Sequence, residues 1–64
     1  MNVMTKRGSA DNAIIYEHYC DTRADMANID KNYITLGSVC IVLKGQDNQL
    51  EIYLAGSDKQ WNLI

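Results

Sequence analysis

An unbroken apolar run at residues 39–43, Val-Cys-Ile-Val-Leu, is the feature that most constrains how this chain can fold. Three of its five residues are β-branched, and Gly37 and Gly45 flank it, which is typical of a β-strand. Apolar side chains at consecutive positions point to both sides of a strand. We therefore expect a strand whose two faces are both covered.

Two further segments complete a β-meander. Residues 50–55 alternate between apolar and polar side chains, and residues 60–64 form a short last strand. Polar turns at residues 45–49 and 56–58 separate these strands. Short turns join antiparallel neighbours, so residues 39–64 are expected to form three antiparallel strands in chain order.

Residues 13–20 are rich in β-branched and aromatic side chains, which favours a strand over the alternative of a helix. Thr22 and Asp25 have the spacing of a capping box in a weakened form, with Asp in place of Glu. A helix of one or two turns should follow, with Met26 and Ile29 facing inward. The predicted fold is mainly β: an antiparallel meander of three to four strands with one short helix.

The N-terminal residues differ in character from the rest. Residues 1–12 form a polar arm, in which Val3 and Met4 are the apolar residues after the first methionine, and residues 13–64 form a single small β-rich domain. A chain of 64 residues buries little apolar surface and usually needs a staple, a metal or a partner. We expect the arm to be extended and to lie against another chain, in a homo-oligomer or other symmetric assembly.

Alternation along the predicted strands divides their side chains between two faces. One face should form the core, and its members are Val39, Ile41, Leu43, Leu50, Ile52, Leu54 and Trp61. The reverse face is also half apolar. One possibility is that residues 13–20 or the short helix of the same chain fold over this face. The other is that a second copy or another protein covers it.

We expect function to lie on that reverse face together with the arm. Four of the five aromatic residues are tyrosines, which suit surfaces that are half wet and half packed. The predicted protein-interface residues are Cys40, Val42, Tyr53, Tyr16, Tyr19, Lys6 and Arg7.

Catalytic and metal chemistry find little support in the sequence. A structural zinc site takes four ligands, and the soft candidates are His18, Cys20 and Cys40. His18 and Cys20 lie about 6–7 Å apart along a strand, too far for a nucleophile and its base. No glycine-rich phosphate loop is present. We expect a non-enzyme without cofactor or metal, in which both cysteines are reduced core residues rather than a disulfide.

Charge and hydropathy exclude other partners. A net charge of −2 with scattered basic residues disfavours nucleic acid. No apolar run approaches the roughly 18–20 residues that cross a bilayer, so we expect no membrane partner. Residues 1–8 contain a Lys-Arg pair without the apolar region of a signal peptide, so nothing here directs secretion.

The C-terminal two thirds resembles a known class of protein. The resemblance covers residues 16–64 and rests on Ala-Asp-Met at 24–26, Gly-Ser-Val-Cys-Ile-Val at 37–42, Ile-Tyr-Leu at 52–54, Ser57 in a turn and Trp61 near the end. In these features the chain resembles short virion-associated structural proteins of phages and prophages of Gram-positive bacteria. The tip at residues 44–48 is longer and more polar than that pattern suggests.

The resemblance implies a function in a phage particle. It points to a small non-enzymatic subunit, an auxiliary head (capsid), connector or tail protein, that binds a larger virion protein and possibly itself. Such a subunit would be assembled in the host cytoplasm and located in the virion. The alternative is a small cytoplasmic regulator or inhibitor that binds one host protein, since an acidic miniature domain can block a basic site.

Overall fold

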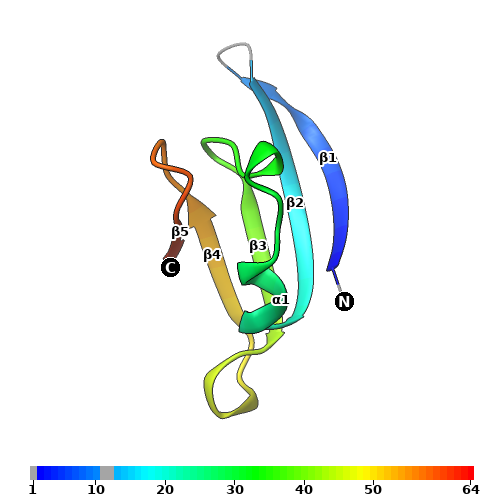
Figure 1. The fold of residues 1–64 in the computed structure, drawn as a ribbon, viewed down its shortest axis with the longest axis vertical. Helices are drawn as coiled ribbons and strands as arrows, with labels where there is room; N and C mark the ends of the chain where they lie inside the picture. The colour runs from blue at the N-terminus through cyan, green and yellow to red at the C-terminus, as the bar shows by residue number, and fades with distance from the viewer. Residues whose placement is uncertain (1, 11–12) are drawn as a thin grey trace.

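The computed structural model describes residues 2–10 and 13–64, and within them it shows one five-stranded sheet with a short helix (Figure 1). The strands lie in chain order across the sheet, from β1 at one edge to β5 at the other. The elements are β1 (Asn2–Ala10), β2 (Ala13–Thr22), α1 (Arg23–Ala27), the 3-10 turn η1 (Lys31–Tyr33), β3 (Val39–Lys44), the 3-10 turn η2 (Gln46–Asn48), β4 (Glu51–Ala55) and β5 (Trp61–Leu63).

The sheet is mixed, and the mainly β prediction is confirmed. Strands β3, β4 and β5 form the expected antiparallel meander, and residues 13–20 lie in a strand rather than a helix. The pairing of β2 with β3 is parallel, which the sequence reading did not anticipate. A parallel pair requires a connection that carries the chain back along the sheet, and here α1 and η1 lie in that connection.

The start of α1 is fixed by the capping box expected from the sequence. The Thr22 hydroxyl accepts a hydrogen bond from the backbone N–H of Asp25, and the Asp25 carboxylate accepts one from the backbone N–H of Thr22. These two bonds satisfy N–H groups that the first turn of a helix leaves without intrahelical partners. A five-residue helix cannot persist alone, so its position depends on packing against the sheet.

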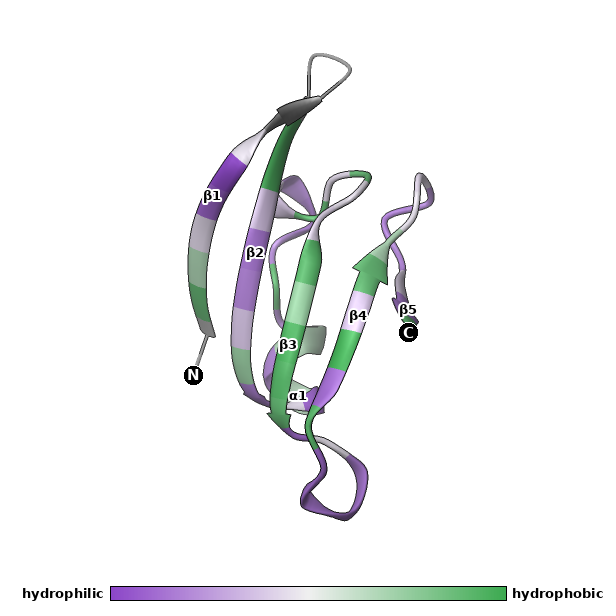
Figure 2. Ribbon diagram, turned by 180° about the vertical axis from the view of Figure 1, so that it is seen from behind, coloured by the Kyte–Doolittle hydropathy of each residue, from purple (hydrophilic) through white to green (hydrophobic). Residues whose placement is uncertain are grey.

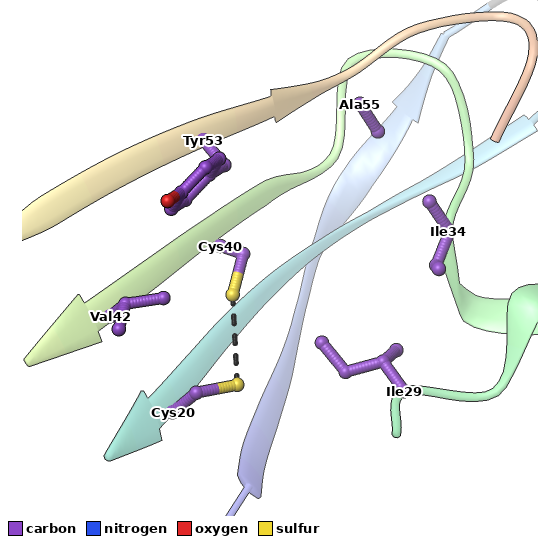
Figure 3. Close-up of a cluster of buried hydrophobic side chains, with 7 residues drawn as sticks. All are labelled: Cys20, Ile29, Ile34, Cys40, Val42, Tyr53 and Ala55. Atoms are coloured by element: carbon purple, nitrogen blue, oxygen red, sulfur yellow. Dashed lines mark hydrogen bonds between the residues drawn. The ribbon is translucent and has the colours of Figure 1, made fainter. Parts of the chain in front are cut away.

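The core lies between the sheet and the β2–β3 connection (Figure 3). Ile29 and Ile34 from the connection meet side chains from β2, β3 and β4, and Met26 and Trp61 pack against the same cluster. The inward orientation predicted for Met26 and Ile29 is therefore confirmed. The sheet contributes Cys20, Cys40, Val42, Tyr53 and Ala55.

The predicted core was assigned to the wrong face of the sheet. Leu43, Leu50, Ile52 and Leu54 are 41–61 % exposed, and Val39 and Ile41 are half-buried. Of the predicted set, Trp61 packs against the observed core. The physical reason is the connection between β2 and β3: it crosses the face that carries Cys40 and Val42, and so that face becomes the interior.

The predicted N-terminal arm is a strand of the chain's own sheet. β1 is extended as expected, but it pairs antiparallel with β2 instead of lying against another chain. Its register shifts between Lys6 and Gly8, which places a bulge at Arg7. Pairing at a sheet edge uses backbone groups, so it needs few apolar side chains. Residues 1, 11 and 12 of the predicted arm lie outside the described residues.

Candidate docking face

The side of the sheet opposite α1 carries a broad apolar surface that no other part of the described chain covers. We call it the open face, and Figure 2 views it with α1 behind the sheet. Its members follow from strand alternation and register, and the apolar ones are Val3, Ile15, Tyr19, Val39, Ile41, Leu43, Ile52, Leu54 and Ile64. Figure 2 colours β3 and most of β4 as hydrophobic along the chain, whichever face each side chain takes.

Five of these side chains form one continuous row across the sheet. Val3 pairs with Tyr19, Tyr19 with Ile41, and Ile41 with Ile52. The backbone N–H of Ile64 donates to the carbonyl of Ile52 at 2.9 Å, which extends the row beyond β4. Directly paired side chains in a sheet are close enough to touch. We call this the apolar row; it runs from edge to edge.

The apolar row is open to solvent. Val3, Ile52 and Ile64 are 48 %, 41 % and 77 % exposed, and Leu43 and Leu54 beside the row are 50 % and 43 % exposed. With the half-buried members of the face, the exposed apolar area is on the order of 600 Å², at the upper end of the largest patch on a typical monomer. The largest apolar patch on a monomer is often functional.

Strand alternation places two carboxylates of β2 on the open face, Glu17 and Asp21, one on either side of Tyr19. Glu17 is paired across strands with Val39 and forms an ion pair with Arg7 at 3.3 Å. The Glu17 side chain is only 15 % exposed, while Arg7 is 62 % exposed at the sheet edge. The pair therefore neutralises the carboxylate without placing an uncompensated charge in the apolar part of the face.

On the covered face, His18 acts as a core residue. It is fully buried, and its Nε2 lies 2.7 Å from the carbonyl oxygen of Tyr33, so the proton of that nitrogen is donated to the carbonyl. The ring also packs edge-on against Trp61, with centroids 5.7 Å apart. His18 thus fastens η1 to the sheet. Its Nδ1 and the Trp61 Nε1 are buried and have no hydrogen-bond partner among the described residues.

The two cysteines face each other inside the core. Cys20 Sγ and Cys40 Sγ are 3.6 Å apart, within hydrogen-bonding distance, and both side chains are buried (Figure 3). The prediction that both are core residues is confirmed. Burial raises the pKa of Cys40 to about 12 and also raises the pKa of Cys20. Both thiols are therefore protonated at neutral pH, which is the unreactive form of the group.

A charged cluster closes the end of the covered face near α1. The Glu51 carboxylate accepts hydrogen bonds from two nitrogens of the Arg23 guanidinium, from the Tyr53 hydroxyl at 2.7 Å and from the backbone N–H of Gln46 at 3.3 Å. Arg23 is the main cause that lowers the pKa of Glu51 to about 2. The cluster ties the start of α1 to β4 and η2, and it serves the fold.

The structure separates the predicted interface residues. Cys40 and Val42 are fully buried and Tyr53 is 7 % exposed, so their assignment to an interface is wrong: the β2–β3 connection covers them. Tyr16 lies half-buried on the same covered side, edge-on to Tyr33 with ring centroids 5.4 Å apart. The remaining three are outside the core: Tyr19 on the open face, and Lys6 and Arg7 exposed on β1.

Sequence reasoning missed the docking residues because it placed them in the core. Ile41, Ile52 and Leu54 were identified correctly as one apolar face, but as the wrong one of the two. Val3 was assigned to the arm and Ile64 to the short last strand, and neither was placed on this face. The available signal was the unbroken run at residues 39–43, which demands cover on both sides while one short helix can cover only one.

The described residues contain no metal site, pocket or membrane-spanning helix. No three side chains of His, Cys, Asp or Glu come together there in a way that could hold a metal ion. The surface formed by those residues contains no pocket. No helix in the same ranges is long and apolar enough to cross a membrane. Comparison with protein-family models, with curated proteins and with solved structures finds no match.

Proposed function

We propose that this protein is a non-enzymatic structural subunit of a larger protein assembly, and that its open face is one of the surfaces buried in that assembly. The observation that carries the proposal is the apolar row, which crosses the whole sheet and remains exposed. Among described side chains, eleven large hydrophobic residues are exposed, whereas the core contains seven hydrophobic residues. A fold that leaves more large apolar groups outside than inside gains from a partner.

The energetic scale supports docking through this surface. Covering roughly 600 Å² of apolar area contributes on the order of 15 kcal/mol before the costs of association. Association costs about 4–15 kcal/mol or more in lost translational and rotational freedom, and ordering the side chains at the interface adds to this cost. These costs offset much of the gain. The free energy that is left allows stable incorporation when the polar groups at the rim of the interface also form hydrogen bonds with the partner. An apolar centre with a polar rim is the usual anatomy of such an interface.

The resemblance to short virion-associated proteins supports a phage particle as the assembly, with a larger head, connector or tail protein in contact with this subunit. The test is the protein content of particles made by the cells that encode the chain. Mass spectrometry of purified particles should detect it at a fixed ratio to the major structural proteins. Recovery of the chain from the soluble fraction with none in the particles would contradict the proposal and favour a small regulator of one host protein.

A pair of variants tests the docking face itself. Ile52→Lys places a charge in the apolar row and should remove the subunit from the particles. Leu36→Lys is the matched control, because Leu36 is 57 % exposed but lies in the β2–β3 connection. Incorporation of both variants at wild-type levels would show that the open face does not mediate docking.

A further inference from the structure

We propose that the occupant of the open face is a second copy of this chain, so that two sheets pack face to face as a symmetric dimer. This inference rests on the proposed function and names the partner of the same surface. The order of layers would be connection, sheet, sheet and connection, with the two apolar rows in the middle. Each sheet would then be covered on both sides, which is what the unbroken run at residues 39–43 requires.

The area of the face fits this occupant. A standard stable interface buries about 800 Å² on each partner. The apolar part of the open face supplies on the order of 600 Å², and the polar rim of the same strands can supply the rest. Interfaces between identical subunits are also more apolar than those between proteins that associate transiently, with about 65 % apolar area. Along β3 and β4, the side chains of the open face are apolar.

The charge distribution permits identical faces to meet. In a two-fold dimer each residue near the axis meets its own copy or a close neighbour, so a central charge would be opposed by the same charge. The apolar row consists of Val3, Tyr19, Ile41, Ile52 and Ile64, none of which has a carboxylate, ammonium or guanidinium side chain. Glu17 is neutralised by its own Arg7, so it does not require a cation from the partner. Asp21, the other carboxylate on this face, lies beside the row near the end of β2 rather than in it.

The packing geometry of two sheets places the central strands of the two copies over each other. Two twisted sheets pack with their strands about 30° apart and their backbones about 10 Å apart. At that angle the side chains of β3 and β4 from one copy would lie over those of the other. Ile41 and Ile52, which are paired on neighbouring strands, would form the centre of the contact.

Sedimentation equilibrium of the full chain tests the proposal. The wild type should have twice the monomer mass of 7.2 kDa at concentrations of about 10–100 µM, and its thermal midpoint should rise with concentration. Ile52→Lys should weaken self-association on the order of 100-fold, as expected for a central interface residue. Leu36→Lys should dimerise as the wild type does. Circular dichroism establishes whether each variant is folded.

A second variant covers the case in which Ile52→Lys does not fold. Ile64 is 77 % exposed and follows β5, so Ile64→Lys leaves the core untouched while it charges one end of the apolar row. It should also weaken the dimer. A wild type that sediments at 7.2 kDa at about 100 µM overturns the inference, as does equal dimerisation of the wild type and a folded open-face variant.

The two proposals can fail separately. A chain that is monomeric in solution yet enters particles in a manner abolished by Ile52→Lys retains the proposed function and excludes the second copy as occupant. A chain that dimerises through the open face but is absent from particles retains the dimer and excludes the structural function.

Discussion

The backbone of Gly45 lies directly against the carboxyl group of Glu51, so that a Cβ at position 45 would overlap that carboxyl. Glycine is needed there for space, because its φ of −80° is open to any residue. Gly45→Ala should displace Glu51 from its partners and lower the urea midpoint of unfolding. Urea unfolding measures the change. In a Glu51→Ala background the same substitution should cost little, and an equal cost in both backgrounds would contradict the explanation.

Stability should depend on pH through Glu51. Its pKa falls from an ordinary 4.5 to about 2 on folding, chiefly because Arg23 binds the carboxylate. The unfolded chain therefore binds more protons than the folded chain between these values. The stabilisation is fully present above about pH 4.5 and is lost as the pH falls towards 2. Urea midpoints across this window should fall more steeply for the wild type than for Glu51→Gln; parallel profiles would exclude Glu51 as the source.

Two nearby residues should differ sharply in their contribution to stability. Ile34 is 4 % exposed in the core, whereas Leu36 is 57 % exposed. Ile34→Ala removes buried contacts and leaves a cavity, so it should cost about 2–4 kcal/mol. Leu36→Ala should change the free energy of unfolding by less than about 0.5 kcal/mol, as is usual for surface positions. Similar losses for both variants would mean that the β2–β3 connection packs differently.

The thiols should be inaccessible in the folded protein. Cys20 and Cys40 are both buried, and burial raises the pKa of each. A thiol reagent such as Ellman's reagent should therefore react slowly with the native chain and modify both cysteines once urea unfolds it. The rate under native conditions should follow the opening of the core. Rapid stoichiometric modification of either thiol in the folded chain would contradict the observed packing.

Local chemistry in the sequence was sufficient for most of the secondary structure. The β-branched content of residues 13–20 and 39–43 indicated strands, and Thr22 with Asp25 predicted the start of α1. Each of these features depends on interactions within a few residues, which is why the sequence alone could determine them.

The sequence could not determine which face of the sheet is interior, because both faces of β3 are apolar. Tertiary structure decided it: β2 and β3 pair in parallel, so the chain between them must return across the sheet, and it covers Cys40 and Val42. That single choice left Ile41 and Ile52 outside and made the opposite face the candidate docking surface. The pairing of β1 with β2 joins strands that are neighbours in the chain, and it was missed because backbone hydrogen bonds at a sheet edge leave little trace in the side-chain pattern.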